Sequence, residues 1–321
     1  MTRTLGYLLM SICACSAKSR HVASPTGSIA APPPPPCGRC NWGFPAIGLA
    51  KRWRDETFRH IRNVCRNSTT RTPLCSDGDI YEFGVFTGRA LKRMAVYVEN
   101  SKYLKPVLNN PDLRLFGFDS FRGLSQDDAA ANNKFVSRGL WKESYATIIN
   151  KTGGGSAPFS AGHFSATAYT GAKSVEEAVS VVKRYIGSKR VKLIPGFLNE
   201  SLTPDIARAH RMRPALFVDI DVDIYRPTFE ALDWMLRHRL IVRGTIVGFD
   251  DFNVGLPAGK YGGSQTWSVV RKGMLEGEPR ALREIEDKWP GLRLSKVSSV
   301  NSRTSRGGQA GWVFTVLATG R

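Results

Sequence analysis

Five aspartates in the second half of this 321-residue chain follow two short apolar segments, residues 215–218 and 245–249. The aspartates are Asp219, Asp221, Asp223, Asp250 and Asp251. Carboxylates that gather closely raise one another's pKa unless a cation or hydrogen-bond donors offset the repulsion. Mg²⁺ is a hard cation that prefers carboxylate oxygens, so these residue types predict a magnesium site if the aspartates converge. The alternative is that they cap turns or face water, Asp219 especially.

The residues between the two apolar segments predict a helix that joins two buried strands. Short runs rich in Val, Ile and Phe are typical of strands buried on both faces. Pro227 suits a first helical position, and apolar residues recur at helical spacing from Phe229 to Leu236. A crossover of this kind makes the strands parallel, and their carboxyl ends then share the edge where open α/β sheets bind ligands. The sequence therefore predicts that the aspartates converge at this edge.

A second candidate site lies upstream, in the sequence DIYEFGVFTG at residues 79–88. The segment reads as a strand that runs into a turn with Gly84 and Gly88, and a helix follows. Glycine lets a ligand approach the backbone closely, and the first turn of a helix offers free N–H groups to a negatively charged ligand. The next predicted strand, Leu113–Asp119, ends in a carboxylate suited to accept hydrogen bonds from ribose hydroxyls. Together these features predict a nucleotide-type site.

Several stretches of the chain, taken in order, resemble one known family. They are EFGVFTGRAL, FGFDSFRGL, SVEEAVSVVKRYIGSKRVKLIPGFLNESL, VDIDVDIYRPTFEAL and GFDDF, within residues 79–252. The combination is similar to the macrocin O-methyltransferase family, whose members methylate sugars with S-adenosyl-L-methionine. The resemblance implies an α/β, Rossmann-like class I methyltransferase fold with a seven-stranded, mostly parallel sheet and an antiparallel C-terminal hairpin. Residues 292–297 and 311–318 read as the two strands of that hairpin.

The resemblance also implies roles for particular residues. The turn after the first strand and the end of the second strand would bind the methionine and ribose parts of the cofactor through Glu82, Gly84, Gly88, Asp119 and Ser120. The ligands of Mg²⁺ would be Asp221, Asp250 and Asp251. Asp223 would take the proton of the acceptor hydroxyl, whereas Asp219 has no role in the family.

The first 54 residues differ from the rest of the chain in composition, because they contain seven Lys or Arg and no acidic residue. They also include an apolar patch and a run of five prolines. This composition predicts a targeting segment and proline-rich linker at residues 1–45. The resemblance implies that a methyltransferase domain follows at residues 46–321, with its core at residues 76–321. An organellar transit peptide is favoured over a secretory signal. No apolar run approaches the roughly 20 residues of a membrane-spanning helix, so none is predicted.

All six cysteines precede residue 76. Cys37 and Cys40 have the spacing of a redox or zinc pair, but no second pair accompanies them, so we interpret them as incidental. Cys65 and Cys75 could form a disulfide if the protein is exported, and the sequence does not decide this.

The charge of the chain bears on its partners. Removing the first 54 residues leaves 39 basic and 27 acidic side chains, a formal net charge of +12. The basic residues are spread in twos and threes, which is typical of solvated faces rather than of a nucleic-acid groove. We therefore predict a Mg²⁺-assisted O-methyltransferase that uses S-adenosyl-L-methionine to modify a small hydroxylated substrate such as a sugar; a homo-oligomer stays open. The alternatives are a metal-dependent DxD glycosyltransferase, which would use Asp221 and Asp223, and a basic nucleic-acid-binding protein or RNA methyltransferase.

Overall fold

The computed structural model describes residues 52–100, 103–108, 110–127, 161–252, 266–273, 275–297 and 311–320. All of them belong to one compact unit, Pro45–Arg321. The predicted targeting segment and linker, with Cys37 and Cys40, lie outside the described residues. Among the helices that the structure describes, none combines the length and apolar character needed to span a bilayer.

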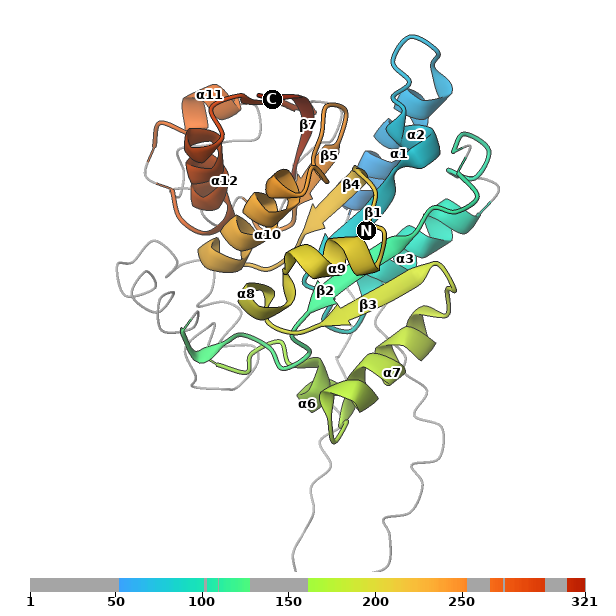
Figure 1. Ribbon diagram of the computed structural model, residues 1–321, viewed down its shortest axis with the longest axis vertical. Coiled ribbons are helices and arrows are strands. Elements are labelled where there is room, and N and C mark those ends of the chain that lie inside the picture. The colour runs from blue at the N-terminus through green and yellow to red at the C-terminus, as the bar shows by residue number, and fades with distance from the viewer. Residues whose placement is uncertain are drawn as a thin grey trace, which may run out of the picture. The chain divides into compact units, whose positions relative to one another are not determined.

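A seven-stranded sheet in the order β3-β2-β1-β4-β5-β7-β6 forms the centre of the described unit (Figure 1). Its strands are β1 (Asp79–Phe83), β2 (Leu115–Asp119), β3 (Val191–Pro195), β4 (Ala215–Ile220), β5 (Ile246–Phe249), β6 (Leu292–Lys296) and β7 (Trp312–Thr319). The first five strands are parallel to their neighbours, whereas β7 is antiparallel to both β5 and β6. The predicted α/β, Rossmann-like fold, with a seven-stranded, mostly parallel sheet and an antiparallel C-terminal hairpin, is confirmed.

Helices cover both faces of the sheet. The helices are α1 (Arg52–Arg66), α2 (Leu74–Asp77), α3 (Arg89–Glu99), α6 (Ala166–Thr170), α7 (Val175–Ile186), α8 (Leu198–Ser201), α9 (Pro204–Ala209), α10 (Tyr225–Arg237), α11 (Trp267–Val270) and α12 (Gly277–Lys288). Apolar residues of α1, α3 and α7 pack in one core cluster, and those of α8, α9, α10 and α12 pack in the other. Every residue of β1 and β4 is buried, because these central strands have helices on both sides.

Two boundaries differ from the sequence prediction. β4 continues to Ile220, so Asp219 lies inside the strand and is fully buried rather than placed after the strand. Helix α10 begins at Tyr225, two residues before the predicted start, and Pro227 lies in its first turn, where a backbone N–H is not needed. Strand ends and helix starts are the positions that hydrophobic spacing locates least well.

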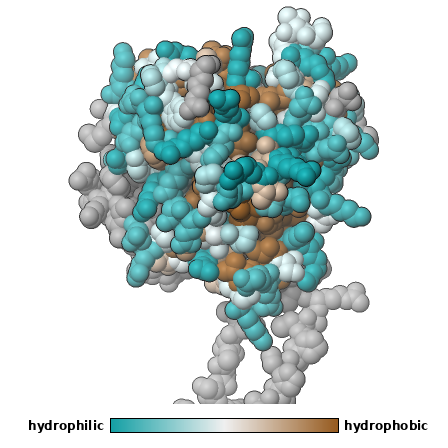
Figure 2. All heavy atoms as spheres, in the orientation of Figure 1, coloured by the Kyte–Doolittle hydropathy of each residue, from teal (hydrophilic) through white to brown (hydrophobic). Residues whose placement is uncertain are grey.

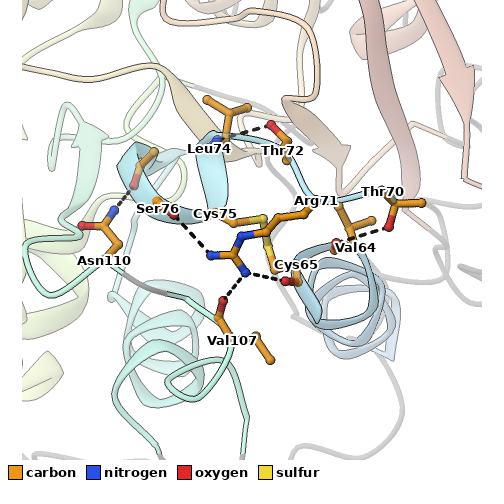
Figure 3. The surroundings of a disulfide bond; sticks show 11 residues. Val64, Cys65, Thr70, Arg71, Thr72, Leu74, Cys75, Ser76, Val107 and Asn110 are labelled. Atoms are coloured by element: carbon orange, nitrogen blue, oxygen red, sulfur yellow. Dashed lines mark hydrogen bonds between the residues drawn. A yellow bond between two sulfur atoms is a disulfide. The ribbon is translucent and has the colours of Figure 1, made fainter. Parts of the chain in front are cut away.

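A disulfide between Cys65 and Cys75, whose Cα atoms lie 5.6 Å apart, links the end of α1 to α2 (Figure 3). The guanidinium of Arg71 crosses this link and donates to the carbonyl oxygens of Cys65, at 2.6 Å, and of Val107, at 3.1 Å. The pairing that the sequence left open is thus formed. It fixes α1 to the segment that leads into β1.

The surface drawn in Figure 2 is mostly hydrophilic, with hydrophobic areas between the polar side chains.

Candidate active site

The three predicted metal ligands converge at the carboxyl edge of the sheet. Asp221 follows β4, and Asp250 and Asp251 follow β5, which is the parallel neighbour of β4. One carboxylate oxygen from each residue lies within 4.8 Å of the others. The predicted convergence is confirmed, whereas the binding of a metal ion stays a prediction.

Asp223 lies in the same cluster, in the connection between β4 and α10. Its backbone has a φ of +63°, in the left-handed region that costs a residue with a Cβ free energy. Burial raises the pKa of Asp223 to about 7, against a lowering hydrogen bond from Asp251, and the charges of Asp221 and Glu278 raise it further. A carboxyl group with this pKa can gain and lose a proton near neutral pH.

Glu278, in the first turn of α12, is a site residue that the sequence analysis missed. Its side chain is 1% exposed, and its Oε2 accepts a hydrogen bond from the backbone N–H of Asp251 at 3.1 Å. Its Oε1 has no hydrogen-bond partner among the residues that the structure describes. Burial raises the pKa of Glu278 well above its usual value, and the charges of Asp251 and Asp250 add to the rise. An acidic residue in a first helical turn ordinarily signals only a favourable dipole interaction, so nothing local marked it.

Arg54, on α1, supplies a positive charge to this cluster and was also missed. Its side chain is 1% exposed, and its Nε and Nη2 donate to the two carboxylate oxygens of Asp219 at 2.6 and 3.1 Å. Nη2 also donates to Asp221 Oδ2 at 2.8 Å, and Nη1 lies 3.2 Å from Asp250 Oδ1. Burial alone would lower the pKa of Arg54, but the three carboxylates hold it above its usual value. Asp219 is therefore neither a turn cap nor exposed, as the alternative had it, but the partner of a buried guanidinium.

Trp53, beside Arg54, donates from its indole Nε1 to Asp250 Oδ1 at 2.7 Å. Its ring occupies a slot made by two glycines. A Cβ at Gly248 would lie 2.4 Å from the ring, and one at Gly311 would lie 2.6 Å from it. No local signal marks this contact in the sequence, because Trp53 and Asp250 are 197 positions apart.

Asp119, at the end of β2, fixes the turn that follows β1. Its Oδ2 accepts from the backbone N–H groups of Val85 and Phe86 at 2.8 and 2.7 Å, and its Oδ1 accepts from Phe121 at 2.5 Å. Burial raises the pKa of Asp119 against the lowering effect of these three donors. Ser120, next along the chain, donates from its hydroxyl to the carbonyl of Gly123 at 2.7 Å.

Glu82, Gly84 and Gly88 lie on the same edge, in β1 and the turn after it, and Glu82 is fully buried. The two glycines have φ values of +91° and +77°. A Cβ at Gly84 would lie 1.8 Å from the carbonyl oxygen of Asp221, and one at Gly88 would lie 2.8 Å from Val182. The absence of a Cβ at these glycines therefore leaves room for the residue after β4 and for helix α7, not for a ligand. The reason given for these glycines from the sequence is corrected accordingly.

Comparisons with known proteins add solved structures of low similarity. No family model and no curated protein sequence matches the chain. The calicheamicin methyltransferase CalS11 is 19% identical over 83% of this chain and 80% of its own, with a TM-score of 0.43. The O-methyltransferase NovP is 15% identical over 82% and 80%, with a TM-score of 0.43. The O-methyltransferase TomG from Streptomyces achromogenes, in complex with SAM, is 14% identical over 84% and 87%, with a TM-score of 0.40. Likeness at this level says nothing of the activity, which rests on the geometry of the site.

Proposed function

We propose that this protein is an O-methyltransferase that uses S-adenosyl-L-methionine and Mg²⁺ to methylate a small hydroxylated acceptor, such as a sugar. The observation that carries the proposal is the meeting of Asp221, Asp250 and Asp251 with Asp223 at the carboxyl edge of the sheet. The turn after β1 and the acidic end of β2 lie at that edge too. The resemblance of residues 79–252 to macrocin O-methyltransferases supports the same function.

S-adenosyl-L-methionine would lie against the turn between β1 and α3, with its ribose near Asp119 and Ser120. The N–H groups of Val85 and Phe86 already donate to Asp119, so the turn keeps its shape without a ligand. A site that is ordered before binding loses less entropy when the ligand arrives. Helix α3 begins directly after Gly88, so its first N–H groups lie at the end of this turn, where a carboxylate would be stabilised.

The carboxylate oxygens of Asp221, Asp250 and Asp251, which we call the triad, are ligands that suit Mg²⁺. An octahedral ion with bonds of about 2.1 Å needs ligand oxygens about 3–4 Å apart, and the three oxygens lie within 4.8 Å of one another. The guanidinium of Arg54 brings one positive charge to a group that also includes the carboxyl groups of Asp219 and Glu278. The negative charge in excess of that cation favours a divalent ion. When bound, Mg²⁺ would polarise the acceptor hydroxyl and lower its pKa.

Asp223 is the residue suited to receive the proton of the acceptor. An unperturbed Asp, with a pKa of about 4, holds a proton poorly at neutral pH. With a pKa of about 7, Asp223 can accept the proton as the oxygen attacks the methyl group and can release it afterwards. Methyl transfer itself needs the acceptor oxygen held in line with the methyl group, which is a matter of positioning.

The glycosyltransferase alternative is not favoured. It would use Asp221 and Asp223 as a DxD pair on a nucleotide-sugar diphosphate. The triad instead joins Asp221 to the two aspartates that follow β5, and Asp223 shares a hydrogen bond with Asp251.

A thermal-shift and calorimetry experiment tests cofactor and metal together. The full chain is titrated with S-adenosylhomocysteine and with a UDP-sugar, each with and without Mg²⁺. We expect S-adenosylhomocysteine to bind and to raise the stability by about 2.7 kcal/mol at a hundredfold excess over its Kd. Mg²⁺ should bind to the wild type and not to Asp221→Ala. Binding of the UDP-sugar without binding of S-adenosylhomocysteine would reverse the assignment.

A further inference from the structure

The amino end of α1 reaches the acidic cluster through two consecutive residues, Trp53 and Arg54. We propose that both are positioning residues, which hold Asp221 and Asp250 in the orientation that a divalent cation requires. The inference rests on the proposed Mg²⁺ site. It adds to that site a helix that precedes every stretch of the family resemblance.

Asp219 fixes the guanidinium of Arg54 from the core side. Both carboxylate oxygens of Asp219 accept from Arg54, at 2.6 and 3.1 Å, and the two side chains are 0% and 1% exposed. A buried carboxylate that lost its cationic partner would be an uncompensated charge in a place that water does not reach. This pair therefore stays formed. The pair also gives Asp219 a function that the resemblance did not supply.

From that fixed point the remaining edge of the guanidinium reaches two of the three metal ligands. Nη2 donates to Asp221 Oδ2 at 2.8 Å, and Nη1 lies 3.2 Å from Asp250 Oδ1. One planar group thus contacts three carboxylates. Asp219 lies within β4, Asp221 follows β4, and Asp250 follows the neighbouring strand β5. A lysine carries the same charge but has a single nitrogen, so it cannot make this set of contacts.

Trp53 holds Asp250 through a second donor. Its Nε1 lies 2.7 Å from Asp250 Oδ1, the same oxygen that faces Arg54. The indole is 3% exposed, and the close approach of Gly248 and Gly311 leaves the ring one orientation. The Cζ of Arg54 also lies 4.6 Å from the centre of the indole ring. The two side chains therefore support each other as well as the carboxylate.

The rest of α1 is anchored in the core, so the pair is carried on a rigid element. Phe58 stacks on Tyr97 with ring centres 4.7 Å apart and meets the edge of Phe217 at 5.6 Å. At the other end of the helix, Cys65 is bonded to Cys75. Groups held on a packed helix are oriented more closely than groups on a loop.

The competing explanation is that Arg54 serves only as a counter-charge for Asp219. Charge alone is kept in Arg54→Lys, and the ring alone is kept in Trp53→Phe. If charge and packing were sufficient, neither variant would change the affinity for a metal ion. If orientation matters, both should weaken it, as loss of groups that orient metal ligands generally does.

The test is a titration of the full chain with Mn²⁺, followed by calorimetry and by electron paramagnetic resonance, without cofactor or acceptor. We expect Arg54→Lys to raise the Kd for Mn²⁺ by about 10- to 100-fold, and Trp53→Phe by about tenfold. Two matched controls lie far from the cluster. Arg114→Lys alters an arginine that bridges buried Asp79, and Trp289→Phe removes an indole donor to Asp233. Both controls should keep the wild-type Kd.

Each outcome decides the matter. If the wild type binds Mn²⁺ and the α1 variants bind it equally well, the inference is wrong while the proposed function stands. If the wild type does not bind Mn²⁺, the metal part of the proposed function and the inference are both wrong. Equal losses in the α1 variants and the controls would also overturn it, since they would mean a general loss of structure. Should Arg54→Lys fail to fold, Trp53→Phe decides, because it keeps the ring in its slot.

Discussion

Two buried networks of aspartate and arginine lie at opposite ends of the same parallel strands, and they differ in their ratio of charges. At the start of β1, Asp79 accepts from Arg114 Nη2 at 2.6 Å and from Arg213 Nη2 at 2.7 Å. The backbone N–H groups of the same two arginines also donate hydrogen bonds to Asp79, at 3.0 and 3.2 Å. At the carboxyl edge one arginine, Arg54, serves three aspartates.

The network at Asp79 stabilises the fold, whereas the network at Arg54 lowers its stability. Four donors serve the two oxygens of Asp79, enough to satisfy a carboxylate, as expected of a structural ion pair. The other network has an excess of carboxyl groups, a non-glycine residue in the left-handed region at Asp223, and raised pKa values at Asp223 and Glu278. Unfavourable charge and backbone strain persist in folded proteins chiefly where function requires them. The ratio of the charges, more than their burial, therefore distinguishes the carboxyl edge, where we propose the active site, from the opposite end of the strands.

At the carboxyl edge, the most damaging substitution should be at Asp223, the proposed proton acceptor. Asp223→Asn should lower methyl transfer by about 10²- to 10⁴-fold, because the variant cannot accept the proton of the acceptor. The measurement follows the methyl group of labelled S-adenosyl-L-methionine onto a panel of hydroxylated sugars. Asp112→Asn, at an exposed aspartate, is the control and should keep full activity. Undiminished transfer by Asp223→Asn would show that the proton goes elsewhere.

The two ends of the strands should respond differently when an aspartate is replaced by asparagine. Asp79→Asn should lower the free energy of unfolding by about 3 kcal/mol, because it removes the partner of two arginines in a buried network. Its affinity for Mn²⁺ should not change. Asp251→Asn should show the opposite pattern, with weaker Mn²⁺ binding and little loss of stability. Urea unfolding and calorimetry on both variants give the answer, and the same pattern in both would contradict the distinction between the two ends.

The disulfide between Cys65 and Cys75 anchors the end of α1 that is far from Trp53 and Arg54. Cys75→Ser should lower the free energy of unfolding by about 2–3 kcal/mol, as expected for a crosslink that closes a loop of this length. The slot around Trp53 should keep α1 in place, so the affinity for Mn²⁺ should fall by less than in Arg54→Lys. The double variant Cys65→Ser/Cys75→Ser should be no less stable than the single one, because both remove the same bond. A much larger loss in the double variant would mean that the two cysteines act separately.

Much of this fold could be predicted from the sequence, because its signals are local. Apolar runs of strand length, helical spacing between them and acids at strand ends required only short windows and the rule that crossovers make strands parallel. That is why Asp221 and Asp250 were expected together and lie together. The exact end of β4 could not be read in the same way, since a buried, paired Asp219 looks the same in sequence as an exposed one.

The contacts made by α1 could not be predicted, because no local pattern encodes them. Arg54 and Asp219 are 165 positions apart, and Trp53 and Asp250 are 197 apart. The glycine slot posed the same problem. Gly248 lies within one predicted strand and Gly311 at the start of another, and only the three-dimensional packing joins them around one indole ring.

Glu278 is buried among the carboxyl groups of the carboxyl edge, and its substitution should change the stability only slightly. In metal-free protein, Glu278→Gln should raise the free energy of unfolding by about 1 kcal/mol, seen as a melting temperature about 2–4 °C higher. The amide oxygen can still accept from the N–H of Asp251, so the hydrogen bond remains. The raised pKa of Glu278 means that the unfolded state holds the ionised carboxyl group more easily than the folded state does, and the amide removes this cost. Glu284→Gln on the same helix is the matched control. Glu284 accepts from Arg280 Nε at 2.9 Å, so its substitution should leave the melting temperature unchanged or lower it. If neither variant were stabilised, the excess of carboxyl groups at the carboxyl edge would cost the fold nothing. If both were stabilised, the gain in Glu278→Gln would not come from that excess.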